Sequence, residues 1–144
     1  MAAQGEPACA SNHAAMDAHP VDLDYDWHEQ YAIGQAFRVG DVIHTSGQAA
    51  IARDGSLVGV GDFAAQAEQT MTNLATVLEA AGSGLDRVFK VNIYLTDMGN
   101  FPAILELRKR WFSPPWPADT IVQVVSLALP ELMIEIEAQA TVAT

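Results

Sequence analysis

The chain has little cysteine, little positive charge and no long apolar run. Its 144 residues contain one cysteine, 7 Lys and Arg and 18 Asp and Glu, which gives a formal net charge of −11. The single cysteine, Cys9, cannot form an internal disulfide, and no basic segment followed by an apolar core opens the chain, so we expect a cytoplasmic protein. No apolar run reaches the ~20 residues that a membrane-spanning helix needs, so we expect no membrane partner.

The shortage of basic residues also bears on whether the protein binds nucleic acid. Nucleic-acid binding depends largely on Lys and Arg side chains that neutralise phosphates. The acidic balance therefore disfavours a nucleic-acid partner and nuclease activity. Half of the residues are apolar and 17% are charged, which is the composition of a globular domain with a substantial core.

The first 26 residues are rich in Ala, Asp and His and have no hydrophobic periodicity. We predict a flexible N-terminal tail over residues 1–26 and a single domain over residues 27–144. The tail contains His13 and His19, and two lone histidines in an acidic segment are more typical of solvated side chains than of metal ligands. We therefore expect neither a metal nor a cofactor.

Hydrophobic periodicity predicts the element order β-β-β-α-β-α-β-β. The expected strands are residues 36–39, 42–48, 56–60 and 87–97, and two within 119–142. The first helix is expected to begin after Asp62 and to end at Gly82. A second helix is expected to begin at Asn100, with Pro102 in its first turn.

The last two strands are predicted to form a hairpin with a turn at Pro130 and Glu131. The first of them is apolar at almost every position, which predicts cover on both sides. The second alternates, so that Glu135 and Glu137 share one face. We expect an α+β fold, one mixed six-stranded sheet with two helices on one face. The other face would lie uncovered in one chain, which favours a closed oligomer.

Several segments together resemble the reactive-intermediate deaminase family, also called RidA or YjgF. They are GDVIHTSGQ (residues 40–48), the first helix (66–88), KVNIYLTDMGNF (90–101), the pair Pro117-Ala118 and IEIEAQA (134–140). The resemblance covers roughly residues 31 to 142. It implies a chorismate-mutase-like fold and a homotrimer whose small-molecule sites lie in the clefts between subunits.

The resemblance also implies roles for individual residues. Glu135 matches the acidic residue that positions the hydrolytic water and would be the catalytic acid or base. Ser46 and Gly47 match substrate-binding positions and can offer hydrogen-bond donors. Tyr31 matches the family's N-terminal tyrosine. For Glu135 and Glu137 a structural role stays open, in which Lys90 pairs with Glu137 across the sheet.

The chain departs from the family after the Pro-Ala pair. Deaminase members have an arginine there that grips the substrate carboxylate, and this chain has Asp119, which places it in an arginine-less branch. A guanidinium holds a carboxylate by two charge-assisted hydrogen bonds, whereas an aspartate repels it. We therefore expect 2-aminoacrylate-type acids to bind poorly and Asp119 to suit a neutral or cationic ligand. Trp116 is either an aromatic wall of this site or a packing residue.

Three functions follow from these residues. The first is an imine or enamine hydrolase, or a related hydration or tautomerisation enzyme, with altered specificity. The second is a non-catalytic protein that binds a small molecule in the same cleft. The third is a subunit that stabilises a partner enzyme.

Overall fold

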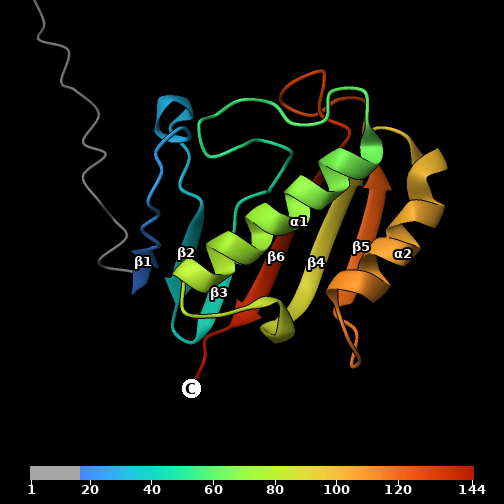
Figure 1. Ribbon diagram of the computed structural model, residues 1–144. Coiled ribbons are helices and arrows are strands. Elements are labelled where there is room, and N and C mark those ends of the chain that lie inside the picture. The colour runs from blue at the N-terminus through green and yellow to red at the C-terminus, as the bar shows by residue number, and fades with distance from the viewer. Residues whose placement is uncertain (1–16) are drawn as a thin grey trace, which may run out of the picture.

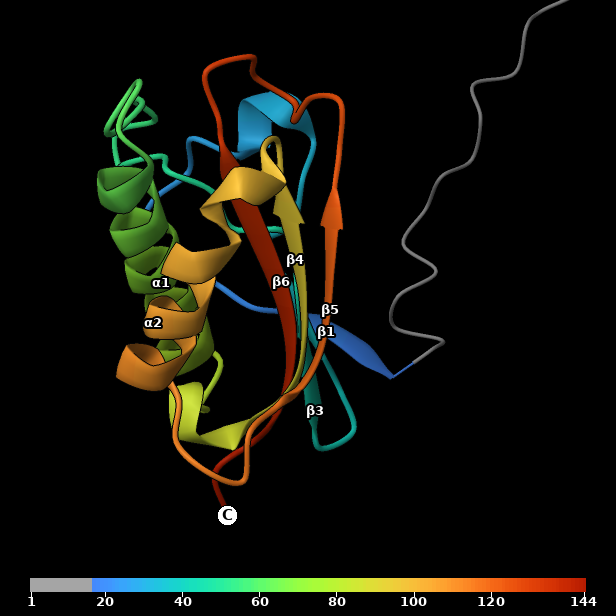
Figure 2. The ribbon, with the colours of Figure 1, turned by 90° about the vertical axis from the view of Figure 1, so that its right-hand side faces the viewer.

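The computed structural model describes residues 17–144 as one six-stranded sheet with two helices (Figure 1). The strands are β1 (Ala18–Pro20), β2 (Ala36–Val39), β3 (Val42–Thr45), β4 (Val88–Leu95), β5 (Ala118–Gln123) and β6 (Ile134–Thr141). The helices are α1 (Phe63–Ala80) and α2 (Phe101–Trp111), with the 3-10 turns η2 (Glu29–Tyr31), η3 (Leu85–Arg87) and η4 (Met98–Asn100). Both helices pack on the same face of the sheet (Figure 2). The predicted α+β fold is confirmed.

The strand order is β1-β2-β3-β6-β4-β5, in which only β4 and β5 are parallel. The predicted C-terminal hairpin is wrong, because β4 lies between β5 and β6. The physical reason is the helix that precedes β5. A strand that returns to its sheet through a helix crossing one face arrives parallel to the strand it left.

The predicted strand at residues 56–60 is also wrong. This segment contributes a single bridge, between Ile51 and Leu57, and Gly59 has a φ of +67° that is incompatible with a regular strand. The sixth strand is β1, which pairs with β2. It falls in the part of the chain that was predicted to be tail, and residues 1–16 of that tail lie outside the described residues.

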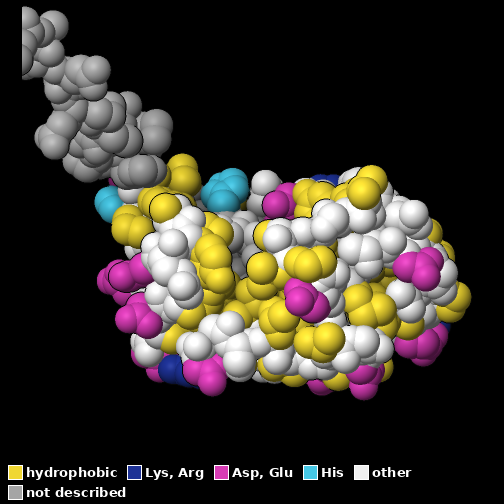
Figure 3. Space-filling model, turned by 90° about the horizontal axis from the view of Figure 1, so that it is seen from above, with side chains coloured by type: hydrophobic (Ala, Val, Ile, Leu, Met, Phe, Trp, Pro, Cys, Tyr) yellow, Lys and Arg dark blue, Asp and Glu magenta, His cyan; other side chains and the backbone are white. Residues whose placement is uncertain are grey.

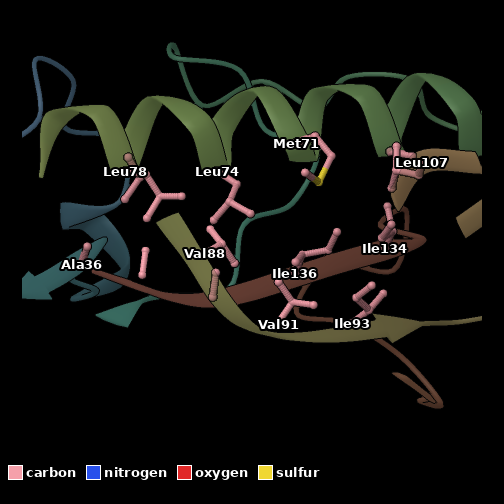
Figure 4. Packing of buried hydrophobic residues seen from close by; sticks show 14 of the residues in the cluster. Ala36, Met71, Leu74, Leu78, Val88, Val91, Ile93, Leu107, Ile134 and Ile136 are labelled. Atoms are coloured by element: carbon pink, nitrogen blue, oxygen red, sulfur yellow. The ribbon is translucent and has the colours of Figure 1, made fainter. Parts of the chain in front are cut away.

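The core lies between the helices and the sheet (Figure 4). Helix α1 begins where the Asp62 side chain accepts a hydrogen bond from the N–H of Ala65 at 3.1 Å. Its side chains Met71, Leu74 and Leu78 are fully buried against the sheet. The helix ends before Gly82, which has a φ of +76°, so the predicted start and stop are confirmed.

The other face of the sheet carries no helix in the part of the chain that the structure describes (Figure 2). Strand β5 lies at the edge and is mostly exposed, so the prediction of cover on both of its sides is wrong for a single chain. A register shift between Val88 and Lys90 turns Phe89 outward, which leaves Phe89 43% exposed. Neither helix of residues 17–144 is long and apolar enough to cross a bilayer.

Candidate functional site

Strand β6 places two carboxylates on the uncovered face of the sheet. Glu135 lies opposite Tyr94, and Glu137 lies opposite Asn92, in the antiparallel pair of β6 and β4. Ile136, between the two acids, is 1% exposed under the helices. Because side chains alternate along a strand, both carboxylates point away from the helices.

Glu137 is fixed by two neighbours on β4. Its Oε1 accepts a hydrogen bond of 2.6 Å from the Asn92 amide and one of 3.1 Å from the Tyr94 hydroxyl. The predicted pairing of Lys90 with Glu137 is wrong, because the Lys90 ammonium donates to the Thr120 hydroxyl at 2.9 Å instead. These contacts hold the Glu137 carboxylate in one position against β4.

Glu135 differs from Glu137 in its surroundings. Its carboxyl group has no hydrogen-bond partner among residues 17–144. Burial raises the pKa of Glu135 above its usual range, and the negative charge of Glu137 raises it further. A carboxyl group that keeps its proton closer to neutral pH and has no partner suits general acid catalysis.

Gly47 lies directly against this acid, just after the end of β3. A Cβ atom built on Gly47 would lie 1.8 Å from Oε1 of Glu135 and 2.6 Å from its Cδ. Only glycine therefore fits beside the carboxyl group in its present position. The N–H of Gly47 has no partner among the described residues, so it can donate to a ligand next to Glu135.

Both hydrogen-bond donors of Ser46 bind backbone carbonyl oxygens. Its hydroxyl donates to the carbonyl oxygen of Gly34 at 2.5 Å, and its N–H donates to the carbonyl oxygen of Gln35 at 2.8 Å. The hydroxyl oxygen can still accept a hydrogen bond, whereas its proton is already used. The structure therefore brings Ser46, Gly47 and Glu135 together. The two hydrogen bonds of Ser46 hold the backbone next to Gly47 in position.

Asp119 is paired with an arginine from α2. Arg108 Nε donates to Oδ2 of Asp119 at 2.8 Å, and Nη2 donates to Oδ1 at 2.6 Å, a two-bond ion pair. The guanidinium compensates the negative charge of Asp119, and the expectation that Asp119 suits a neutral or cationic ligand stays a prediction. Sequence reasoning missed Arg108, although a cation within the apolar stripe of this helix was a signal.

Within one chain, Asp119 and Glu135 lie on opposite faces of the sheet. Asp119 is level with Val91, a core residue beneath the helices. Trp116 lines the same cavity as Asp119 and Arg108 and is 53% exposed. Tyr31 is also exposed and packs edge-on against Trp27, with ring centres 6.2 Å apart. On a single copy, Asp119 and Trp116 therefore lie on the opposite side of the sheet from Glu135.

Among the described residues, potential metal ligands are scattered over the surface. No cluster of three or more His, Cys, Asp or Glu that could hold a metal ion occurs in residues 17–144. His19 contacts the neighbouring Asp17 at 3.1 Å on the surface, and His13 lies outside the described residues.

Comparisons with known proteins agree on the family. A family model described as Endoribonuclease L-PSP matches residues 28–142. The mitochondrial protein mmf2 of Schizosaccharomyces pombe is 43% identical over 95 residues, which are 66% of this chain and 74% of that protein. A protein of Dermatophagoides farinae named 2-iminobutanoate/2-iminopropanoate deaminase is 36% identical over 93 residues, covering 65% of this chain and 73% of the relative.

Solved structures show the same fold. Yeast Mmf1 superposes with a TM-score of 0.80 at 29% identity, over 88% of this chain and 99% of that one. RidA from an Antarctic Psychrobacter superposes with a TM-score of 0.72 at 32% identity, over 86% of this chain and 94% of that one. Because mmf2 is named as mitochondrial, the cytoplasmic location expected for this chain stays a prediction.

The fold defines a class of α+β protein in which helices cover one face of a single sheet (Figure 2), and here two carboxylates, Glu135 and Glu137, lie on the other face. Within that class, the chain belongs to the Endoribonuclease L-PSP family, also called RidA/YjgF. The resemblance stated from the sequence segments is confirmed.

Proposed function

We propose that this protein hydrolyses imines or enamines that lack a carboxylate, in clefts that two copies form together. The observation that carries the proposal is Glu135, a half-buried, unpaired carboxyl group with a raised pKa, lying against the open backbone of Gly47. A relative named as an imine deaminase supports this reaction class. Asp119 in place of the family's arginine supports a different substrate.

In the proposed reaction Glu135 begins as the acid. Its proton goes to the imine nitrogen while a water oxygen forms a bond to the imine carbon, and a proton of that water returns to the carboxylate. The resulting carbinolamine then takes a second proton on nitrogen, its C–N bond breaks, and its hydroxyl proton is lost. One water is consumed, and one ammonia and one carbonyl compound are formed. The N–H of Gly47 would hold a polar group of the substrate beside Glu135.

Two copies are needed because the site's halves lie on opposite faces of one sheet. In the proposed homotrimer the uncovered face of one copy, with Glu135, meets the β5 edge of the next copy, with Asp119 and Trp116. A cyclic arrangement repeats this contact and would cover the exposed sheet face. The net charge of −11 makes RNA an unfavourable alternative substrate.

Ammonia release from a matched pair of imines tests the proposed function. The pair is freshly generated 2-iminopropionate and its neutral amide, 2-iminopropanamide. We expect the protein to accelerate ammonia release from the amide and to leave the rate for the acid within about threefold of the uncatalysed rate, because a substrate carboxylate would have to compete with Asp119 for Arg108. Acceleration of the acid imine above the amide would contradict the substrate class. Saturable binding of the amide without ammonia release would favour the non-catalytic binding protein.

A further inference from the structure

An apolar cavity of about 350 Å³ lies beside α2 and the start of β5. Its apolar walls are Val91, Leu105, Phe112, Trp116 and Pro117. Leu105 and Trp116 are 41% and 53% exposed, which is unusual for large apolar side chains so close together. The cavity is large enough for a small ring or a short branched chain.

The polar end of this cavity is the ion pair of Arg108 and Asp119. Lys109 also lines the cavity, and its ammonium is paired with Glu106 at 3.2 Å. The Arg108 and Asp119 side chains are only 23% and 20% exposed, and the guanidinium carbon lies 5.8 Å from the ring centre of Phe101. Asp119 uses the Nε and Nη2 side of the guanidinium. Nη1 has no partner among residues 17–144, so it keeps donors for a ligand.

The pair selects against charge of either sign. A ligand carboxylate would compete with Asp119 for Arg108 and would lie close to the Asp119 oxygens, where like charges repel. A ligand ammonium would meet the guanidinium with the same penalty. An uncharged ligand avoids both penalties and can still use a free donor of Arg108 and an acceptor of Asp119 together.

We propose that this cavity binds an uncharged, largely apolar molecule through a primary amide, lactam or imide. These groups carry a carbonyl oxygen and an N–H on the same side, which match the donor of Arg108 and the acceptor of Asp119. Arg108 is then the specificity-determining residue, and Asp119 positions it. The inference rests on the proposed function, because it takes this cavity as the half of the proposed two-copy site that holds the substrate.

Binding of benzamide and benzoate to the full-length protein tests the inference. The two probes have nearly the same shape and differ in charge. We expect benzamide to shift the indole N–H resonance of Trp116 in a saturable way, with a dissociation constant at least about tenfold below that of benzoate. Equal or tighter binding of benzoate, or no saturable shift with benzamide, would overturn the inference.

Three variants test the roles of Arg108 and Asp119 in this binding. Arg108→Leu should abolish benzamide binding, whereas Arg110→Leu, on a helix residue that pairs with Glu68 instead, should retain it. Asp119→Asn leaves Arg108 uncompensated and should reverse the preference toward benzoate. Should Arg108→Leu fail to fold, the probe preference of the native sequence and its reversal in Asp119→Asn decide. A preference for benzamide that persists in Asp119→Asn would overturn the role of the pair.

The readout also separates this inference from the proposed function. Ammonia release from a neutral imine together with tighter benzoate binding would overturn the inference alone. Benzamide binding with no ammonia release from any imine would overturn the proposed function alone.

Discussion

Replacing Glu135 with Gln should reduce ammonia release from 2-iminopropanamide at least about a hundredfold, the usual contribution of a positioned acid or base. Gln has nearly the same shape as a protonated Glu and cannot transfer the proton. The measurement is the initial rate of ammonia release at saturating imine, corrected for the uncatalysed reaction. An unchanged rate would exclude Glu135 as the reacting acid.

The same substitution should stabilise the fold at neutral pH. The pKa of Glu135 is raised by burial and by Glu137, so between its ordinary and raised values the folded protein binds more protons than the unfolded chain. Stability is therefore lost as the pH rises through that interval. Glu135→Gln removes this loss, so its urea midpoint should exceed that of the native sequence at pH 7. The difference should vanish at a pH below the ordinary pKa.

Gly47→Ala is expected to disable the same acid by displacing it. The added Cβ would overlap Oε1, Cδ and Cγ of Glu135, at 1.8, 2.6 and 2.8 Å, so the carboxyl group must move. A misplacement of about 1 Å in a reacting group costs about a hundredfold in rate. Circular dichroism and thermal unfolding should show a folded protein, because the clash is with the end of a flexible side chain.

A double substitution distinguishes this steric effect from general damage. If Gly47→Ala acts through Glu135, it should reduce the rate little in a protein that already carries Glu135→Gln. Independent, multiplicative losses in the double variant would contradict the account. They would show that Gly47 matters for a reason other than its contact with Glu135.

Strand β6 was the part of the fold that the sequence determined best. Its alternation places Ile136 in the core and Glu135 on the open face, and both positions are confirmed. The pairing of β5 could not be predicted from its own residues, because an apolar strand can lie in the centre of a sheet or at an edge that another copy of the chain covers. The crossover through α2 decides the pairing, and the hairpin interpretation ignored it.

Gly47 and Glu135 lie far apart in the chain, and the resemblance of sequence segments predicted that both belong to one site. The structure brings the two residues into contact. Arg108 was missed because its partner Asp119 was judged by its own charge. An ion pair between a helix and a strand depends on their packing, which residue types alone do not specify.

Mixing two inactive variants tests most directly the central claim that one site is completed by two copies. Glu135→Gln disables the acid on the open face, and Arg108→Leu disables the pair beside β5. Unfolded together and refolded as mixed oligomers in equal amounts, the two variants should recover about a quarter of the native rate of ammonia release from 2-iminopropanamide. When copies mix at random in a closed ring, a quarter of the contacts between copies combine an intact Glu135 with an intact Arg108. No recovery in mixed oligomers would contradict a shared site.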